Sequence, residues 1–447
     1  MSNVALRRSL LFTMALPAIM QGFMHAPAAS LLQGIYAKHA GLPLAALGTA
    51  VLLTRLFDAV TDPLIGHLSD IWHRRTGTRK PWVLAGTAIT VCGLWFLYQP
   101  PAEVTVGYFT LWFLVAYLGW TVTEIPYRAW SLELSSDYDQ RTRISTWITI
   151  ALLAGTLLFF LTPLLGSALG LVSSTELNLE SLGVASVLIV LLMPLLNLIA
   201  VLRVPDGFAD SGHRPDSGRE VWRSVAGNRP LLYFTGVFLV FGFATGMNQG
   251  AAYLYVDTYL GLAKQLAGLL VLAFVAQLTG APVWAWACKR YEKHRAWSMS
   301  LVLQGISLLG LGFVPPGEAG LAPIIGVLFV YHFAASSLSV AAPAILGDIV
   351  DHGRLTLGRD RAGLYISFYT MMVKSLMGFG VAFGLILLGG FGFDATAKTQ
   401  TTGGTVGILF VVAYGPAIGI LAMVPFLWKF PINRARHEEE LRLLGRT

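Results

Sequence analysis

The chain has 447 residues, of which 55% are hydrophobic and 12% are charged, with a formal net charge of +7. A soluble protein of this length would carry about twice that charged fraction, so the composition excludes a soluble globular fold and predicts a polytopic membrane protein. The mean hydropathy of +0.65 also indicates a membrane protein. The two cysteines, Cys92 and Cys288, lie in apolar sequence and are expected to be core residues rather than a disulfide or a metal pair.

Twelve apolar runs divide the chain, and each is near the length that crosses a bilayer as a helix. The first run follows Arg7 and Arg8 as in a signal peptide, but eleven further runs favour a retained first helix. The predicted spans are 10–36, 42–69, 82–99, 105–132, 144–169, 182–203, 229–257, 264–288, 296–315, 322–350, 361–390 and 404–429. The sequence therefore predicts an all-α membrane protein with twelve transmembrane helices.

Lysine and arginine are distributed unevenly between the loops on the two sides of these helices. With a cytoplasmic N-terminus, the outer loops hold only Lys38, Lys264 and Lys398. Three more basic residues fall within spans, and the rest of the 31 face the cytoplasm, as the positive-inside rule requires. The basic surplus therefore predicts that both termini are cytoplasmic, and it does not indicate a nucleic-acid partner.

The first span contains one ionisable residue, His25. A lone histidine among Met, Ala and Pro is commonly a hydrogen-bonded core residue, and the alternative is a place in a polar cavity. The fifth span contains no charge at all. These two spans therefore offer few charged groups to a ligand.

The second span carries three charges at membrane depth. Asp58 and Asp62 are four residues apart and share one helical face, and Arg55 precedes Asp58 by three residues on the same stripe. At about 1.5 Å per residue, Asp58 lies roughly 24 Å from Leu42 and about 18 Å from Asp70, near the bilayer midplane. Charges at that depth cost about 2.5–3.5 kcal/mol each, which makes them candidates for function.

The fourth span is apolar until it reaches Thr121, Glu124 and Arg128. Glu124 and Arg128 are four residues apart, so one interpretation is an ion pair within the helix. In the other interpretation Glu124 joins a polar cavity, and the sequence leaves both open. Arg128 by itself is expected to have a structural role.

A polar stretch in the middle of the chain predicts two six-helix halves. Residues 204–228 contain Pro, Gly, Ser and charged residues and read as a flexible cytoplasmic linker with a short surface helix at its end. The predicted organisation is a bundle at 1–203, the linker at 204–228, a second bundle at 229–429 and a cytoplasmic tail at 430–447.

The second half repeats features of the first. Aligning Pro282 with Pro63 places Gln277 opposite Asp58, so the basic loop is retained while the carboxylates are replaced. Duplicated halves are typical of secondary transporters, which bind their substrate between the halves at the midplane. Carboxylates that only supported the fold would be expected in both copies, so their presence in one copy favours a function.

The eleventh span contains one charge, Lys374, about 20 Å from Arg361 and again at midplane depth. A lysine buried in a membrane needs a partner, and Asp58 and Asp62 are the candidates at that depth. A fixed structural salt bridge is the alternative. Two acids facing one base leave an odd charge, and that favours a titratable or cation-exchanging cluster.

Two carboxylates one turn apart at low dielectric require a proton, a bound cation or the lysine between them. The available ligands are hard oxygens from Asp58, Asp62 and Thr61, with Thr121 as a further candidate. Such oxygens suit Na⁺, Li⁺ or H⁺ and no transition metal, because the cluster has no His and Cys set. The sequence also lacks a P-loop, an HExxH motif and an evident catalytic triad, so neither an enzyme nor an organic cofactor is predicted.

The run RLFDAVTDPLIG at 55–66, RKPW at 79–82, GDIVDHG at 347–353 with GLYIS at 363–367, and Lys374 resemble the glycoside–pentoside–hexuronide:cation symporters. This is the melibiose-permease branch of the major facilitator superfamily. The resemblance covers nearly the whole chain and implies the twelve-helix, alternating-access fold of a plasma-membrane (inner-membrane) symporter, expected to act as a monomer. It also implies that Asp58, Thr61, Asp62 and Thr121 bind the cation. Lys374 then faces that site, and Glu124 stands near the substrate.

The chain departs from the sugar-carrying members in its first and fifth spans. Those members have an acidic residue in the first span and an arginine in the fifth, whereas this chain has Gln21-Gly22 and Trp147 to Thr149. Arg128 and Ser339 replace aromatic residues in the fourth and tenth spans. A sugar or glycoside-like solute is the leading substrate class, a lysophospholipid is the alternative, and a non-transporting scaffold or sensor is a third hypothesis.

Overall fold

A computed structural model describes residues 7–135, 137–207, 224–357 and 362–443, and within these ranges the chain is helical and contains no strand. Ten helices in the described residues are long and apolar enough to cross a membrane. The first and ninth predicted spans correspond to α1 and α11, which are not among the ten. Twelve spans are consistent with this fold and stay a prediction, and most of the predicted linker, 208–223, lies outside the described residues.

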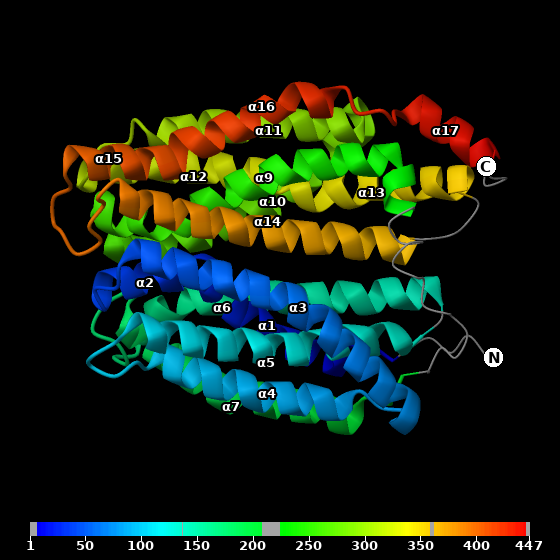
Figure 1. The fold of residues 1–447 in the computed structure, drawn as a ribbon, viewed down its shortest axis with the longest axis horizontal. Helices are drawn as coiled ribbons and strands as arrows, with labels where there is room; N and C mark the ends of the chain where they lie inside the picture. The colour runs from blue at the N-terminus through cyan, green and yellow to red at the C-terminus, as the bar shows by residue number, and fades with distance from the viewer. Residues whose placement is uncertain (1–6, 136, 208–223, 358–361, 444–447) are drawn as a thin grey trace. The chain divides into compact units, whose positions relative to one another are not determined.

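The chain divides into two compact units, 1–213 with 263–268 and 214–262 with 269–447. The helices of unit 1 are coloured blue to green in Figure 1. They are α1 (Arg8–Ser30), α2 (Leu32–His39), α3 (Leu44–Thr76), α4 (Lys80–Tyr98), α5 (Val106–Glu133), α6 (Tyr138–Ala168) and α7 (Leu179–Arg203). The predicted boundaries of the two halves, near 203 and 229, fall close to this division and stay a prediction.

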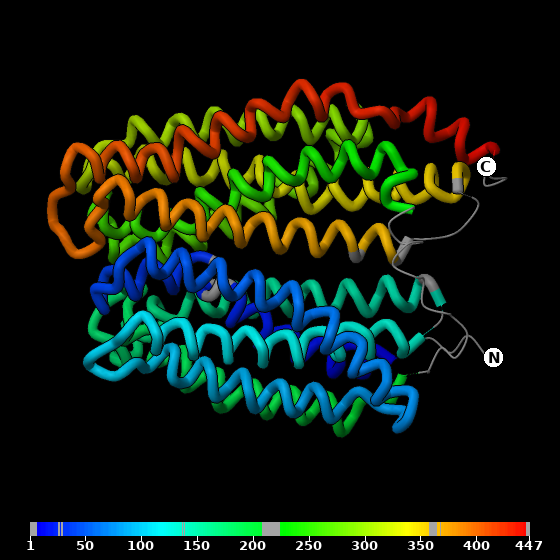
Figure 2. The backbone as a smooth tube through the Cα atoms, viewed as in Figure 1, coloured from blue at the N-terminus to red at the C-terminus, as the bar shows by residue number. Residues whose placement is uncertain are grey.

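Unit 2 contains the remaining helices, with the first residues of α10 assigned to unit 1. They are α9 (Arg229–Leu254), α10 (Leu266–Tyr291), α11 (Lys293–Leu311), α12 (Leu321–Ala335), α13 (Ser337–Leu357), α14 (Ala362–Gly390), α15 (Thr402–Leu409), α16 (Gly415–Trp428) and α17 (Arg434–Leu443). Two π-helical turns, η1 (Tyr255–Tyr259) and η4 (Phe410–Tyr414), continue α9 and join α15 to α16. In Figure 2 the backbone tube follows α15 and α16 as one continuous run near the C-terminus.

Several predicted spans have different ends in the structure. The second span continues to Thr76 because its charged residues extend the helix beyond the apolar run, and Gly77, at φ 75°, ends it in the left-handed conformation that glycine tolerates. The first span is interrupted at Leu31, which separates α1 from α2 while its N–H still donates to the Pro27 carbonyl over 3.0 Å. The tenth breaks at Ser336, whose hydroxyl donates to the Phe333 carbonyl and competes with the helical backbone bonds.

Glycines allow α1 and α6 to touch backbone to backbone in unit 1. A Cβ at Gly155 would lie 1.7 Å from the Ile19 carbonyl oxygen, and one at Gly22 would lie 1.9 Å from that of Leu152. The Thr156 hydroxyl donates to the Gly22 carbonyl over 3.2 Å across the same contact. Small residues at helix crossings provide close van der Waals packing where lipid supplies no hydrophobic driving force.

Unit 2 uses the same arrangement between α9 and α14. A Cβ at Gly246 would lie 2.0 Å from the Met377 carbonyl oxygen, and one at Gly380 would lie 2.2 Å from that of Phe243. In each unit, the helix of the first predicted span thus packs through glycines against the helix of the fifth. These pairs are α1 with α6 in unit 1 and α9 with α14 in unit 2. This likeness supports the duplication predicted from the sequence.

Replacing Gly155 with alanine is expected to destabilise the protein by about 1–3 kcal/mol, because the new methyl group overlaps the Ile19 carbonyl. The matched control is Gly183→Ala on α7, where nothing lies within 4 Å of the new Cβ. Thermal unfolding of both variants in detergent measures the difference. Equal midpoints for the two variants would contradict the close crossing of α1 and α6.

Candidate functional site

The candidate site is built on the middle of α3, where polar side chains interrupt an apolar helix. Asp58 and Thr61 are buried, with 4% and 8% of their surface exposed, and Asp62 is partly buried one turn along. The spacing of four residues brings the two carboxylates to the same helical face, as the sequence predicts. Thr121, 2% exposed, approaches this face from α5.

Arg55 and Asp58 form an ion pair within α3. The guanidinium Nη1 lies 2.9 Å from the Asp58 Oδ2, and its Nη2 donates to the Tyr117 hydroxyl over 2.7 Å. The guanidinium carbon also lies 4.5 Å from the centroid of the Tyr117 ring, within the range of a cation–π contact. Arg55 is thereby held between α3 and α5, with its charge directed at Asp58.

Asp62 receives a hydrogen bond from the other helix. The Thr121 hydroxyl donates to the Asp62 Oδ1 over 2.9 Å, so α5 orients this carboxylate. The Thr61 hydroxyl donates to the Phe57 carbonyl over 3.0 Å, which leaves its oxygen lone pairs available as acceptors. The contact of Thr121 with Asp62 thus joins α5 to α3, whereas Asp58 is paired with Arg55 within α3.

The charge of this cluster in unit 1 follows from its members. Arg55 compensates one carboxylate, so Arg55, Asp58 and Asp62 carry a net charge of −1 when both carboxylates are ionised. The sequence argument counted the two carboxylates against Lys374, and the structure adds Arg55 to that balance. One monovalent cation or one proton neutralises the three groups.

Tyr117 is the functional candidate that the sequence reasoning missed. It precedes Thr121 by four residues, and Glu124 and Arg128 follow Thr121 by three and seven. Spacings of three and four place all four residues on one face of α5. Helical periodicity on α5 was therefore a signal that could have identified Tyr117 as a partner of Arg55.

Glu124 and Arg128 form the ion pair that their spacing predicts. The Glu124 Oε1 lies 2.9 Å from the Arg128 Nε and 2.7 Å from its Nη2. The Glu124 side chain is 17% exposed and the Arg128 side chain 61% exposed. Arg128 thus compensates the charge of Glu124, and a contact of Glu124 with substrate stays a prediction.

The remaining predicted site residues, His25, Gln277 and Lys374, lie on α1, α10 and α14. The His25 ring meets the Trp120 ring edge-on at 4.9 Å, next to Tyr117, so His25 lies close to the site. In unit 2, the Gln277 amide nitrogen lies 3.2 Å from the His332 Nδ1, which gives the counterpart of Asp58 a neutral partner. Lys374 lies on α14 and is partly buried. Its predicted pairing with the carboxylates of α3 stays a prediction.

A second polar cluster fastens the far end of α3. Arg79, just before α4, bonds to Glu133 on α5 with its Nε at 3.0 Å, to the Asp70 Oδ1 at 2.7 Å and to the Ser69 hydroxyl at 3.0 Å. Burial lowers the pKa of Arg79, but the hydrogen bonds with Glu133 and Asp70 outweigh burial and hold that pKa above its ordinary value. In the sequence, Arg79 stands out only as the first residue of the RKPW motif at 79–82.

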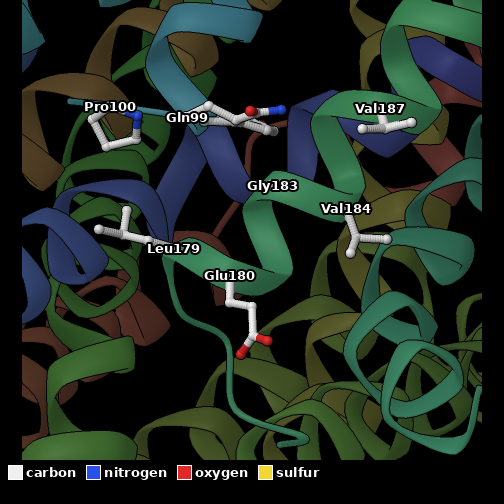
Figure 3. Close-up of a pocket in the computed structure, with 8 residues that line it drawn as sticks. Gln99, Pro100, Leu179, Glu180, Gly183, Val184 and Val187 are labelled. Atoms are coloured by element: carbon white, nitrogen blue, oxygen red, sulfur yellow. The ribbon is translucent and has the colours of Figure 1, made fainter. Parts of the chain in front are cut away.

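A cavity of about 550 Å³ lies between the end of α4 and the start of α7 (Figure 3). Gln99 and Pro100 border it on one side, and Leu179, Val184 and Val187 follow α7. Its one carboxylate, Glu180, accepts a hydrogen bond from the Ser173 backbone N–H at 2.9 Å and is directed away from Gln99 in the figure. None of the predicted site residues lines this cavity.

The residues that the structure describes contain no group of three or more His, Cys, Asp and Glu side chains placed to hold a metal ion. The cluster on α3 and α5 offers carboxylate and hydroxyl oxygens, which suit a hard monovalent cation. Cys92 is exposed and Cys288 is buried, and each is a free thiol.

The helical fold and the charged cluster inside a membrane helix define a polytopic membrane transporter. The chain matches the model of the MFS/sugar transport protein family over residues 13–434, and it belongs to that family. It is a transport protein and not an enzyme, as the sequence predicts.

Curated relatives align with the chain over most of their length. The inner membrane symporter YicJ of Escherichia coli is 28% identical and covers 85% of this chain and 82% of its own. The putative glycoside/cation symporter YagG of the same organism is 26% identical, over 95% of this chain and 92% of YagG. The sodium-dependent lysophosphatidylcholine symporter 1 of Xenopus tropicalis is 22% identical, over 87% of this chain and 81% of that symporter.

Solved structures share the fold at low sequence identity. The nucleoside transporter NupG matches with a TM-score of 0.67 and 14% identity, over 95% of this chain and all of its own. A D-xylose–proton symporter matches with a TM-score of 0.66 and 12% identity, over 96% of this chain and 98% of the symporter. These neighbours show the major facilitator fold that the resemblance implied.

Replacing Tyr117 with phenylalanine is expected to lower the free energy of unfolding by about 1–3 kcal/mol, because a buried Arg55 N–H loses its acceptor while the ring stays. The control is Tyr98→Phe, since the buried Tyr98 hydroxyl makes no hydrogen bond within the described residues. Unfolding is followed by differential scanning fluorimetry. A loss of stability as large in Tyr98→Phe as in Tyr117→Phe would contradict the assignment.

Proposed function

We propose that the chain is a cation-coupled secondary symporter of a sugar or glycoside-like small solute, working by alternating access. The observation that carries the proposal is the cluster of Arg55, Asp58 and Asp62 inside α3, with its net charge of −1. Arg55 and Asp58 form an ion pair within α3, and Thr121 donates to Asp62 one turn along, so the cluster offers carboxylate and hydroxyl oxygens to a mobile cation. The names of the bacterial relatives, which include a glycoside/cation symporter, support the same substrate class.

The coupling ion is proposed to bind among Asp58, Thr61, Asp62 and Thr121. Thr121 already orients the Asp62 carboxylate, and the Thr61 hydroxyl oxygen has free lone pairs beside it in the same helix. Oxygen ligands of this kind bind Na⁺ or Li⁺, and the same carboxylate accepts a proton. One charge crossing the membrane gains about 2.3 kcal/mol per 100 mV, enough to concentrate a neutral solute roughly fiftyfold.

Lys374 is proposed as the charge that balances the cluster when the cation is absent. Adding one lysine to the net charge of −1 gives a neutral set, and adding one cation instead gives the same result. A cation and a lysine that neutralise the same carboxylate exclude each other, and this exclusion is a physical basis for coupling. Fixed charge in a membrane helix is unfavourable, so each state of the transport cycle has to supply one of the two.

A polar substrate is supported by hydrogen-bonding groups on α1 and α5. Gln21 is 4% exposed, and its amide nitrogen has no hydrogen-bond partner within the described residues. A buried donor of this kind costs about 1–3 kcal/mol until an acceptor reaches it, and a substrate hydroxyl is such an acceptor. Glu124 and His25 are further candidates for this region.

A lysophospholipid substrate is the second candidate. The Xenopus relative carries that substrate class in its name, and the neutral Gln21 stands where sugar carriers have an acidic residue. The cation half of the proposal is the same in both cases. We further propose a monomer in the plasma (inner) membrane with both termini in the cytoplasm, as the distribution of lysine and arginine indicates.

Replacing Asp58 or Asp62 with asparagine is expected to lower cation-driven solute accumulation by at least about tenfold, because a neutral amide cannot bind or release the coupling charge. The measurement is uptake into proteoliposomes with an inward Na⁺ or H⁺ gradient, across a panel of glycosides and lysophosphatidylcholine. Glu103→Gln, an exposed carboxylate far along the chain from α3, is the control. Full gradient-driven uptake by both aspartate variants would refute the proposed site, and lysophosphatidylcholine as the sole solute would decide the substrate class.

Thr121→Val is expected to weaken the apparent affinity for the coupling cation by about tenfold, because one oxygen ligand of about 1.4 kcal/mol is lost. The matched control is Thr123→Val in the same helix, since the buried Thr123 hydroxyl donates only to the Gly119 carbonyl among the contacts described. The measurement is the rise in unfolding temperature as NaCl or LiCl replaces choline chloride. The same measurement across a pH series tests the proton as the coupling cation. Equal affinities in both variants would remove Thr121 from the site.

A further inference from the structure

A short polar helix, α17, lies against the end of α13 in unit 2 (Figure 1). Its sequence, RARHEEELRL, is charged along almost its whole length. Within α17 the buried residue is Glu440, with 5% of its surface exposed. A carboxylate rather than an apolar side chain is therefore the group that this helix buries.

Glu440 is contacted by polar side chains from two helices. Its Oε1 lies 2.7 Å from the Nδ1 of His352 on α13, which is itself 9% exposed. Arg436, one turn earlier in α17, donates from its Nε to the same oxygen over 3.2 Å. The His352–Glu440 pair is the buried contact by which α17 is joined to α13.

A second polar contact lies one turn earlier along both α13 and α17. The Asp348 Oδ1 lies 3.4 Å from the His437 Nε2 and 2.6 Å from the Lys293 Nζ. Lys293 begins α11, so Asp348 joins α11, α13 and α17 at one point. Arg434 adds a hydrogen bond from its guanidinium to the Lys289 carbonyl at the end of α10.

The connection between α10 and α11 is held in one conformation at this place. Glu292, between the two helices, has a φ of 76°, in the left-handed region that costs a non-glycine residue about 1–3 kcal/mol. Its carboxylate lies 3.3 Å from His294 and 3.5 Å from Arg295. The strain persists because the surrounding charges fix the backbone.

A cavity of about 200 Å³ remains under α17. The Cys288 thiol, His294 and Asp348 line it from α10, α11 and α13, and His437 lines it from α17. Cys288 is 8% exposed. The contacts that fasten α17 over this cavity are polar, and Ile345 and Ile432 are the apolar residues of the lining.

We propose that α17 is a releasable latch, closed by the Glu440–His352 and Asp348–His437 pairs, which holds the end of α13 against α10 and α11. Water and counter-ions replace the polar contacts of α17 on release. α13 keeps its own packing against α11, including the Asp348–Lys293 pair, and loses the contacts that α17 adds at its end. The latch goes beyond the transport function, because it regulates the mobility of one half-helix whichever solute is carried.

The native Cys288 thiol reports on this latch in the full-length protein. In a Cys92→Ser background, reconstituted into nanodiscs, the rate of Cys288 modification by N-ethylmaleimide measures how often α17 opens. Glu440→Ala is expected to raise that rate by about tenfold, since a buried charged contact is lost. Glu439→Ala, a neighbouring exposed carboxylate in the same helix, is the matched control and is expected to react at the wild-type rate.

His352→Ala removes the same pair from the α13 side and is expected to raise the rate equally, so the test does not depend on one variant folding. Cys92 modification in a Cys288→Ser background is expected to stay unchanged, because Cys92 lies in unit 1. Equal Cys288 rates in Glu440→Ala and Glu439→Ala would overturn the latch. A parallel rise at Cys92 would also overturn it, because the loosening would then be global.

Discussion

The ion pair between Arg55 and Asp58 allows α3 to carry a charged site through a membrane. A single ionised carboxylate in hydrocarbon is expensive, and the guanidinium removes that cost for Asp58 while Tyr117 holds the guanidinium in place. Asp62 lies one turn further along α3, and the Thr121 hydroxyl orients it from α5. The carboxylate that we propose as the carrier of the varying charge therefore lies where two helices meet.

The glycine crossings explain how such a site is supported in lipid. Backbone contacts at Gly22 and Gly155 in unit 1, and at Gly246 and Gly380 in unit 2, pack the helices closely. Polar groups lie on α3 and α5 and near the helix ends, where Arg79 and Lys293 bind carboxylates. Each unit thereby combines a tightly packed helix pair with a charged cluster.

Hydropathy and spacing predicted the helical membrane fold and the shared face of Asp58 and Asp62. The ion pair of Glu124 with Arg128 was one of two interpretations that the sequence left open. Helix ends were less predictable, because Gly77 and the serine at 336 act through local backbone bonds that a hydropathy window does not register. Tyr117 was missed because an aromatic residue in an apolar helix does not stand out. The bond between Arg55 and Asp58 required coordinates, because the sequence showed only that the two residues share a helical stripe.

The central claim is that the Asp62 carboxylate on α3 carries the coupling charge. The most direct test measures the reversal potential of solute-driven current in proteoliposomes and converts it to charges moved per neutral solute. The account predicts one positive charge per solute for the wild type, whether the ion is Na⁺ or H⁺, and no coupled charge for Asp62→Asn. A ratio of zero in the wild type, or an unchanged ratio in the variant, would contradict it.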